Sequence, residues 1–321
     1  MTEILQINNL HTYFNTDTAV ARAVEGASFN ISKGETLALV GESGCGKTVT
    51  ALSIMRLVPA ITGEIVQGEI IFQGHNLLNL SEFEMRAMRG QKIGMVFQEP
   101  MSSLNPLFTI GYQIQEAILA HQRMSKQQAK SQVIELLNKV EMPEPGQRYS
   151  DYPHNLSGGL RQRAMIAQAL AAHPELLIAD EPTTALDVTI QAQILKLFSR
   201  LKQTKEMSIL LITHDLGVVA EIADRVCIMY AGRIVEEAGV LPIFNQPRHP
   251  YTDGLLKSIA ARNYSRQRLM VIPGVVPEPA NKPGGCAFHP RCRRADLTCR
   301  REMPEHLETE SGHKVSCWHP L

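Results

Sequence analysis

The sequence GESGCGKT at residues 41–48 constrains the fold of this chain more than any other feature. It follows a solid apolar run at residues 36–40, which is typical of a fully buried parallel strand, and a helical pattern begins at Lys47. In that setting the glycines let backbone N–H groups curl around phosphate oxygens, and the helix start adds the positive end of its dipole. Residues 41–48, the phosphate loop, therefore predict an α/β fold that binds the phosphates of a nucleotide.

The hydrophobic pattern along the chain supports this fold class. Residues 3–35 alternate apolar and polar side chains, which is the period of half-buried strands, and residues 110–141 have a helical pattern that breaks only near Pro143. Strands are expected at residues 69–73, 93–98, 176–179, 208–213 and 225–229, and helices at 47–57, 158–172, 188–204 and 216–222. Because strands and helices alternate in the second half of the chain, we expect a parallel sheet covered by helices.

The composition is that of an ordinary globular protein of 321 residues. Lys and Arg number 32 and Asp and Glu number 32, so the chain lacks the basic excess of a dedicated nucleic-acid-binding protein. No apolar run approaches the roughly 20 residues of a membrane-spanning helix, and the first ten residues do not resemble a secretory signal. We therefore expect a cytoplasmic protein that would work at a membrane only by docking on something that spans it.

Four polar side chains carry the chemistry that the phosphate loop needs. Lys47 would neutralise the outer phosphates, and the hydroxyl of Thr48 would bind Mg²⁺. Asp180 and Glu181 end an apolar strand, at the edge of a parallel sheet where ligands bind. Asp180 would hold Mg²⁺, directly or through water, and Glu181 would polarise the water that attacks the γ-phosphate. Alone, these acids would be ordinary surface residues before Pro182, but the phosphate loop makes them candidate site residues.

Gln98, His214 and Asp187 lie at the ends of predicted elements and are weaker candidates. Gln98 ends a strand pattern and could touch the metal or the water. His214 also follows a strand and could sense the γ-phosphate. Asp187 is either the cap of the next helix or a contact across a dimer interface, and Asp215 is expected to be a helix cap.

The sequence LSGG at residues 156–159, the signature segment, precedes a helix. Ser157 is a natural helix cap, so the structural interpretation is a capped glycine turn. In the functional interpretation, Ser157, Gly158 and Gly159 bind a phosphate at the same helix N-terminus. One chain cannot easily bring two such sites to one ATP, whereas a second copy facing it could. The signature segment therefore indicates a dimer with nucleotide at its interface.

Four of the six cysteines crowd into the last part of the chain, which we call the cysteine tail (residues 284–321). The tail is too short and too poor in apolar residues to form a core unaided, so it needs a further stabilising element such as a bound metal or a disulfide. In a reducing compartment a local cluster of cysteines favours metal over disulfides, either zinc or an iron–sulfur cluster, although it could also be incidental. The candidate ligands are Cys286, Cys292, Cys299 and Cys317, with His289, His313 and His319 as possible substitutes.

The two remaining cysteines are expected to be structural. Cys45 lies inside the phosphate loop and is interpreted as a small residue that fits there. Cys227 lies in a predicted strand and is interpreted as a core residue.

Together these motifs resemble the ATP-binding subunits of ABC transporters, over residues 1 to about 260. The resemblance lies in Walker A at residues 41–48, Gln98, LSGG at 156–159, the Walker B strand into Asp180 and Glu181, TALD at 184–187, and His214. It implies a P-loop ABC ATPase with a RecA-like parallel-sheet core, an antiparallel β subdomain and an α-helical signature subdomain. The implied ranges are 1–260 for the nucleotide-binding domain, about 99–172 for its helical subdomain, 261–283 for a linker and 284–321 for a small cysteine-rich extension.

The resemblance also implies the roles of individual residues. Glu181, His214 and Gln98 would act in catalysis, and an aromatic residue near the start would stack on adenine, with Phe14 aligning best and Tyr13 as its rival. The implied nucleotide contacts are Phe14, Gly41, Ser43, Gly44, Cys45, Gly46, Lys47, Thr48, Ser157, Gly158, Gly159 and Asp187, and the implied Mg²⁺ contacts are Thr48, Gln98 and Asp180. Two residues depart from the common pattern, because Leu160 stands where a glutamine is usual and Thr184 where a serine is usual.

Narrower phrases resemble the dipeptide, oligopeptide and nickel importer branch. These are QEPMSSLNP at residues 98–106, FNQPRHPYTDGLL at 244–256, and a cysteine spacing similar to the [4Fe–4S]-binding extension of dipeptide importer ATPases. The implied cofactors are ATP, Mg²⁺ and a [4Fe–4S] cluster on Cys286, Cys292, Cys299 and Cys317, with Zn²⁺ as the alternative. Residues 98–115, the docking segment, would grip a permease helix.

The implied function is an ATPase subunit that powers the import of di- or oligopeptides at the cytoplasmic face of the bacterial inner membrane. Its partners would be a homologous second ATP-binding subunit, in a heterodimer or homodimer, two membrane permeases and an external solute-binding protein. Nickel or another small solute is the alternative cargo. A soluble ABC-type ATPase acting on nucleic acid fits less well, because the chain has neither a long coiled-coil insertion nor a second ATPase head.

Overall fold

The computed structural model describes the chain apart from residues 1, 18, 185, 204–206, 264–271 and 311. The described residues divide into two compact units. The first unit consists of Lys33–Glu35 and Asn79–Ile212, and the second of Thr2–Ser32, Thr36–Leu78 and Thr213–Leu321. Among the described residues, no helix combines the length and the apolar character that crossing a membrane requires.

The sheet of the first unit is parallel, as the sequence predicts. Its strands are ordered β8 (Ser208–Thr213), β7 (Leu176–Asp180) and β6 (Ile93–Val96). Leu176 pairs with Ser208 on one side and with Ile93 on the other, and every residue of the three strands is buried. Burial on both faces explains why these strands are uninterrupted apolar runs in the sequence.

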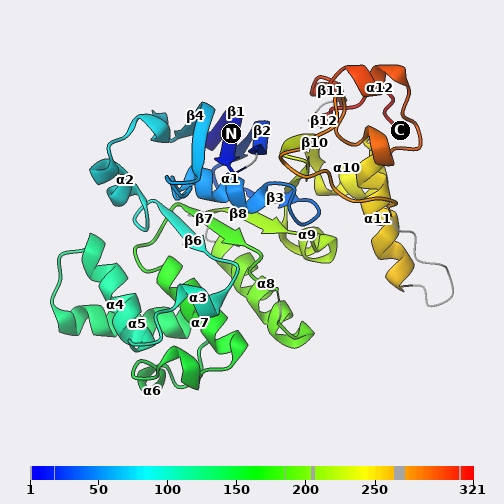
Figure 1. Ribbon diagram of the computed structural model, residues 1–321. Coiled ribbons are helices and arrows are strands. Elements are labelled where there is room, and N and C mark those ends of the chain that lie inside the picture. The colour runs from blue at the N-terminus through cyan, green and yellow to red at the C-terminus, as the bar shows by residue number, and fades with distance from the viewer. Residues whose placement is uncertain (1, 18, 185, 204–206, 264–271, 311) are drawn as a thin grey trace. The chain divides into compact units, whose positions relative to one another are not determined.

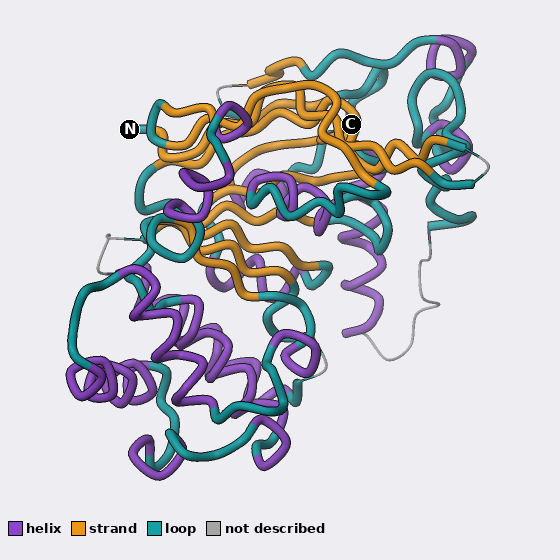
Figure 2. Tube along the Cα trace, turned by 60° about the vertical axis from the view of Figure 1, so that its left-hand side comes forward, coloured by secondary structure: helices purple, strands orange, loops and turns teal. Residues whose placement is uncertain are grey.

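Helices make up most of the rest of the first unit, and α4, α5 and α7 lie side by side (Figures 1 and 2). The helices are α2 (Glu82–Met88), α3 (Pro100–Ser103), α4 (Ile110–His121), α5 (Lys126–Lys139), α6 (Pro145–Arg148), α7 (Gly158–Ala169) and α8 (Val188–Gln203), with 3₁₀ turns η1 (Leu77–Asn79) before α2 and η2 (Pro153–Asn155) before α7. Ile114 of α4, Val133 of α5 and Ile166 of α7 are fully buried. Helices α3 to α7 lie within residues 99–172, the range in which the sequence predicts a helical subdomain.

The helical pattern at residues 110–141 forms two helices, so the prediction of one pattern reaching Pro143 is wrong. α4 ends at His121 and α5 begins after Ser125. The Ser125 hydroxyl accepts a hydrogen bond from the backbone N–H of Gln128 at 3.3 Å, and the Gln128 side chain accepts one from the backbone N–H of Ser125 at 2.9 Å. This capping box satisfies N–H groups that a new helix start leaves without partners.

The second unit contains an antiparallel sheet with strand order β2 (Val20–Ser32), β1 (Glu3–Asn15), β4 (Gly63–Phe72) and β5 (His75–Asn76). Leu5 pairs with Phe72, and both are fully buried. β4 begins well before the strand expected at residues 69–73. The reason is that Gly68 lies inside the strand with a φ of 110°, where an added Cβ would lie 2.6 Å from the carbonyl oxygen of Asn9. Gly68 thus marks a close approach of two strands and not a strand end.

The remaining strands of this unit are ordered β11 (Leu307–Glu310), β12 (His313–Val315), β10 (Arg233–Gly239), β9 (Arg225–Tyr230) and β3 (Thr36–Val40). β3 runs parallel to β9, and the other pairs are antiparallel. The helices of the unit are α1 (Lys47–Ile54), α9 (Leu216–Ile222), α10 (Val240–Asn245), α11 (Pro250–Asn263) and α12 (Leu297–Arg301), with the 3₁₀ turn η3 (His289–Arg291). Strands β11 and β12 of the cysteine tail therefore continue the strand order beyond β10.

The cysteine tail also contributes to the core of the second unit. Phe288 is buried, with its ring centroid 5.2 Å from that of Tyr230 and 5.4 Å from that of Tyr251. The segment before the tail is partly held as well, because the backbone N–H of Arg22 donates to the carbonyl oxygen of Pro279 at 2.9 Å. The tail therefore forms part of the hydrophobic core of the second unit.

Candidate functional site

The phosphate loop connects β3 to α1, as the sequence predicts. Two of its glycines lie where a side chain would collide with backbone. A Cβ on Gly41 would lie 2.2 Å from the carbonyl oxygen of Met229, and a Cβ on Gly46 would lie 2.5 Å from that of Ala23. Gly46 also has a φ of 110°, which favours glycine. The loop is thus packed directly against the backbone of β2 and β9, which fixes the path of its own N–H groups.

Lys47 lies folded over the phosphate loop. Its Nζ donates hydrogen bonds to the carbonyl oxygens of Gly41 at 2.7 Å and Glu42 at 3.0 Å, and the residue is only 5% exposed. The neighbouring Thr48 is exposed at the first turn of α1. Cys45 is fully buried, and burial raises the pKa of its thiol, which fits the structural role expected for it. An ammonium held among carbonyl oxygens marks a place where negative phosphate oxygens would be stabilised.

In the first unit, the strand β7 leads directly into the two candidate carboxylates. Asp180 is its last residue and is buried. Glu181 follows with a φ of 46°, a left-handed conformation that is rare for a residue with a side chain. Its Oε2 accepts hydrogen bonds from Nε2 of Gln98 at 3.1 Å and from Oγ1 of Thr184 at 2.9 Å. The structure therefore brings together Gln98 and Glu181, and adds Thr184, to which the sequence assigned no role in the site.

The signature segment is a helix start. The Ser157 hydroxyl accepts a hydrogen bond from the backbone N–H of Leu160 at 3.4 Å, so Ser157 caps α7. Gly159 is buried, and a Cβ there would lie 2.8 Å from a side-chain carbon of Ile190. Gly158 is exposed in the first turn of the helix. The segment thus presents an accessible helix N-terminus that is packed closely against α8.

Asp187 lies at the start of α8 and also has a local partner. Its carboxylate accepts a hydrogen bond from the backbone N–H of Ile190 at 3.0 Å. This bond is that of a helix cap, one of the two interpretations of Asp187 from the sequence. Ala185, within the TALD motif at 184–187, lies outside the described residues, as does Thr204 at the expected end of this helix.

His214 and Phe14 belong to the second unit, as does the phosphate loop. His214 is exposed directly after β8, and Asp215 caps α9 by accepting a hydrogen bond from the backbone N–H of Gly217 at 2.8 Å. Phe14 is half-buried in β1, and its ring packs against Gly63. The rival Tyr13 has other partners, since its hydroxyl lies 3.1 Å from His11 Nδ1.

The four tail cysteines converge. The backbone N–H of Cys286 donates to the carbonyl oxygen of Cys299 at 2.8 Å. Burial raises the pKa of the Cys286, Cys299 and Cys317 thiols, that of Cys317 to about 11. The neighbouring cysteines, Cys292 among them, raise these pKa values further, because negative charges brought close together repel. Cys227, by contrast, is fully buried in β9, as expected of a core residue.

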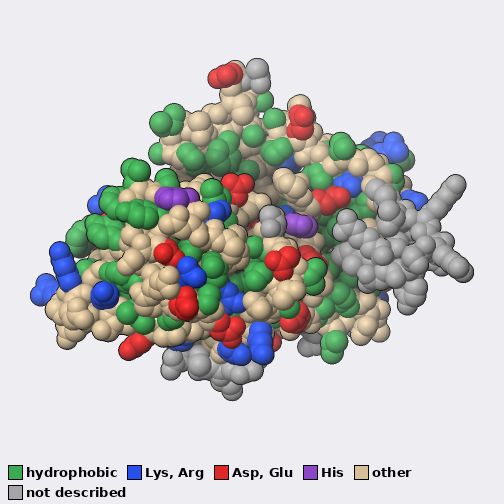
Figure 3. Space-filling model, turned by 90° about the horizontal axis from the view of Figure 1, so that it is seen from below, with side chains coloured by type: hydrophobic (Ala, Val, Ile, Leu, Met, Phe, Trp, Pro, Cys, Tyr) green, Lys and Arg blue, Asp and Glu red, His purple; other side chains and the backbone are tan. Residues whose placement is uncertain are grey.

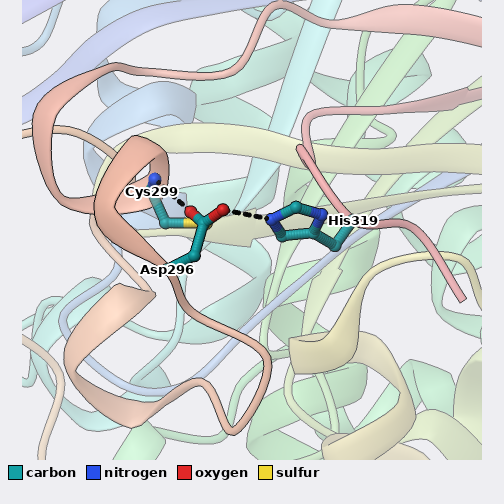
Figure 4. Close-up of side chains that lie close together, drawn as sticks. All are labelled: Asp296, Cys299 and His319. Atoms are coloured by element: carbon teal, nitrogen blue, oxygen red, sulfur yellow. Dashed lines mark hydrogen bonds and ion pairs between the residues drawn. The ribbon is translucent and has the colours of Figure 1, made fainter.

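Asp296 joins Cys299 and His319 in a compact group that sequence reasoning missed (Figure 4). The Asp296 carboxylate accepts hydrogen bonds from the backbone N–H of Cys299 at 2.9 Å and from His319 Nε2 at 3.0 Å. These bonds lower the pKa of Asp296 to about 2, and the bond from the Cys299 N–H has the largest effect. One potential ligand atom from each residue lies within 4.8 Å of the others. An acid in a loop gives no signal in the sequence, because acids commonly cap short helices.

The other two tail histidines have different partners. His289 Nδ1 lies 3.0 Å from the carbonyl oxygen of Cys286. His313 Nε2 lies 2.8 Å from the buried carboxylate of Glu236. Of the three histidines that the sequence offered as substitute ligands, His319 is therefore the one grouped with a cysteine and an acid.

Comparison with known proteins agrees with these motifs. The family model described as ABC transporter matches residues 24–184, and the model described as oligopeptide/dipeptide transporter, C-terminal region, matches residues 235–299. A probable peptide ABC transporter ATP-binding protein of Sinorhizobium fredii is 53% identical over 98% of this chain and 94% of its own. The dipeptide transport ATP-binding protein DppD of Bacillus subtilis is 48% identical over 99% of this chain and 95% of its own.

A solved structure shows the same fold. It is the dimeric structure of a post-hydrolysis state of an ATP-binding cassette bound to ADP and Pi, with a TM-score of 0.67. It is 27% identical in sequence and covers 74% of this chain and 98% of its own. The chain belongs to the family of ABC transporter ATP-binding proteins, in its oligopeptide and dipeptide branch.

Proposed function

We propose that this chain is the ATP-hydrolysing subunit that powers the import of di- or oligopeptides through a membrane ABC transporter. The observation that carries the proposal is the Lys47 ammonium, held among carbonyl oxygens of a glycine-rich loop between β3 and α1. The peptide cargo is supported by relatives that are named as peptide and dipeptide transport ATP-binding proteins and that match nearly the whole chain. The chain would hydrolyse ATP at the cytoplasmic face of the inner membrane.

The residues of the site divide the work of ATP hydrolysis. Lys47 would turn from the loop carbonyls to the outer phosphates of ATP, and Thr48 and Asp180 would hold Mg²⁺, which neutralises phosphate charge. Glu181 would hold the attacking water, and Gln98 would keep the Glu181 carboxylate oriented through their hydrogen bond. His214 would contact the γ-phosphate, and Phe14 would stack on the adenine.

We further propose that the working unit is a dimer of ATP-binding subunits. The N-terminus of α7, with Ser157 and Gly158 exposed, is suited to bind the phosphates of an ATP held by the opposite subunit. The dimeric, ADP-bound cassette among the solved structures supports this arrangement. The opposite subunit is a homologue of this chain or a second copy, and the ATP sites form only where two subunits meet.

The docking segment is proposed to contact the permeases. It exposes large apolar side chains, with Met101, Leu107, Phe108 and Tyr112 all at least 44% exposed. The rings of Phe108 and Tyr112 stack with their centroids 5.0 Å apart. An apolar surface of this kind suits a short helix of another protein. The docking segment begins at Gln98, which donates a hydrogen bond to Glu181. The segment would therefore link the bound permease helix to the Glu181 carboxylate.

The cysteine tail is proposed to bind a [4Fe–4S] cluster through Cys286, Cys292, Cys299 and Cys317. The proposal is supported by the chemistry of the donors, because thiolates are the usual ligands of such clusters, and by the mutual effect of the four thiols on their pKa values. The cluster would staple the tail to the sheet. Zn²⁺ is the alternative occupant, and the neighbouring His319 and Asp296 would favour it as nitrogen and oxygen donors.

A comparison of the isolated chain with the assembled transporter tests the proposed function. The chain is reconstituted with its permeases and partner subunit in liposomes, and ATP turnover and peptide uptake are measured together. We expect turnover that depends on assembly and uptake that depends on ATP. Turnover by a strictly monomeric chain as fast as that of the complex would overturn the proposal. On the face that Figure 3 shows, acidic and basic side chains are interspersed.

A further inference from the structure

The second residue of the phosphate loop, Glu42, is tied to distant parts of the chain at both its backbone and its side chain. Its backbone N–H donates a hydrogen bond to Tyr251 Oη at 2.9 Å. Its carboxylate receives both arms of the Arg291 guanidinium, from Nη1 at 2.6 Å and from Nη2 at 3.0 Å. Arg291 lies 249 positions further along the chain, inside the cysteine tail. A two-armed arginine–carboxylate pair is both strong and strict in its geometry.

The Arg291 side chain is itself held firmly. It is 5% exposed, and its Nε donates a hydrogen bond to the carbonyl oxygen of Pro273 at 3.0 Å. The guanidinium carbon lies 5.8 Å from the ring centroid of Tyr230 and 6.0 Å from that of Phe288. Arginine side chains are charged in proteins, and the hydrogen bond with Glu42 raises the pKa of Arg291 further. Arg291 is thus a preoriented clamp and not a mobile surface side chain.

A second part of the same region braces the other end of the phosphate loop. The backbone N–H of Gly232 donates to the carbonyl oxygen of Cys45 at 2.8 Å. Lys282 in turn donates to the carbonyl oxygen of Ala231 at 2.6 Å and to the Glu25 carboxylate at 3.1 Å. The last part of the chain therefore contacts the phosphate loop directly through Arg291. It also contacts the loop indirectly, because Lys282 binds Ala231 and the next residue, Gly232, binds Cys45.

We propose that Arg291 is a positioning residue for nucleotide binding, which holds and neutralises Glu42 so that the phosphate loop can accept the phosphates of ATP. The proposal rests on the proposed nucleotide site at the phosphate loop. Lys47 already donates to the backbone carbonyl of Glu42. Without Arg291, the Glu42 carboxylate would carry an uncompensated charge beside the bound phosphates and would compete with them for Lys47.

The position of Arg291 in the chain links this clamp to the cysteines. Arg291 ends the turn η3 and directly precedes Cys292. Within that turn, the backbone N–H of His289 donates to the carbonyl oxygen of Cys286 at 2.9 Å, and that of Cys292 donates to the carbonyl oxygen of His289 at 3.2 Å. The backbone of this turn therefore connects Arg291 to both Cys286 and Cys292. The cysteine tail would in this way set the ATP affinity of the loop.

The proposal is tested by equilibrium binding of a fluorescent ATP analogue to the full-length chain with its partner subunit. Arg291→Ala is expected to weaken binding by about tenfold, within the usual range of coupling between linked sites. Glu42→Gln alone should change binding by less than about threefold, because a neutral amide at that place does not repel phosphate. The double variant Glu42→Gln/Arg291→Ala should recover to within about threefold of the wild type for the same reason.

Controls separate this proposal from its alternatives. Arg293→Ala removes an exposed arginine two residues away and should leave binding unchanged. Wild-type binding by Arg291→Ala would overturn the proposal, and so would a double variant as weak as the single one, since that pattern indicates a general loss of structure. Lys47→Ala tests the nucleotide site itself, so retained binding in that variant would contradict the proposed function and not the role of Arg291.

Discussion

The side-chain amide of Gln98 donates a hydrogen bond to the Glu181 carboxylate over 3.1 Å, although the two residues are 83 positions apart. Thr184 donates to the same oxygen, Oε2, at 2.9 Å. The carboxylate is therefore oriented by side chains from two other places in the first unit. A carboxylate held in one orientation can direct one water toward a phosphorus atom, which is the task proposed for Glu181.

Replacement of Glu181 by glutamine is expected to preserve ATP binding and to slow steady-state turnover by about 10²–10⁴-fold, the usual contribution of a general base. The amide keeps the shape of the carboxylate but cannot accept the proton of the water. With hydrolysis blocked, ATP should trap the closed dimer, which size-exclusion chromatography detects. The control is Glu135→Gln, at an exposed position on α5. Normal turnover in the Glu181 variant would remove this residue from its proposed role.

Removal of the Gln98 amide should affect turnover more than ATP affinity. In Gln98→Ala, Glu181 keeps its charge but loses the hydrogen bond that the Gln98 amide donates, so we expect kcat to fall by about tenfold with a smaller change in KM. Gln127→Ala, an exposed position on α5, is the matched control. Equal losses in the two variants, or a change confined to KM, would contradict an orienting role for Gln98.

Loss of the Lys47 ammonium is expected to abolish measurable ATP binding. In Lys47→Ala no cation remains among the loop carbonyls to neutralise the outer phosphates. Binding of a fluorescent ATP analogue measures this effect without any need for hydrolysis. Lys139→Ala, at an exposed position near the end of α5, controls for the general loss of a positive charge. Retained affinity in Lys47→Ala would mean that the phosphates bind elsewhere.

Protein purified without oxygen should be brown and should contain iron and sulfide. Cys292→Ala is expected to bleach it, because loss of one of four thiolate ligands weakens the binding of such a cluster. The matched control is Cys227→Ala, which removes a buried thiol far from the tail in the sequence. Visible absorption and iron analysis measure the outcome. A colourless protein with stoichiometric zinc would refute the cluster and would direct attention to Asp296 and His319 as co-ligands.

The parts of the fold that the sequence predicts are those with strong local signals. The strand before the phosphate loop and the helix after it follow from an apolar run, a glycine pattern and a helical period. The helix break before Ser125 was also signalled, by a capping box, but the polar composition around it hid the boundary. The length of β4 was not predicted, because a glycine in a sequence suggests a turn. In the structure, Gly68 lies inside the strand and allows the backbone of β1 to approach closely.

The contacts that join distant segments had no such signal. Glu42 lies between the glycines that define the phosphate-loop motif, and Arg291 lies in a region rich in arginine, so nothing in the sequence pairs them. The sequence also gives no signal for Asp296, because its contact with His319 arises only when the chain folds. Pairing of charged residues far apart in the sequence is decided by tertiary packing, which local periodicity does not encode.

Truncation of Phe288 should destabilise the second unit and not only the tail. The ring is 3% exposed and packs edge-on against Tyr230, so Phe288→Ala is expected to lower the free energy of unfolding by about 3–5 kcal/mol, as large-to-small core substitutions do. Urea unfolding measures the change, and Phe83→Ala is the control because Phe83 is 84% exposed on α2. That control should stay within about 0.5 kcal/mol of the wild type. Equal stability of the two variants would show that the tail folds apart from the core that Tyr230 and Tyr251 form, and Arg291 would then have no fixed support from which to hold Glu42.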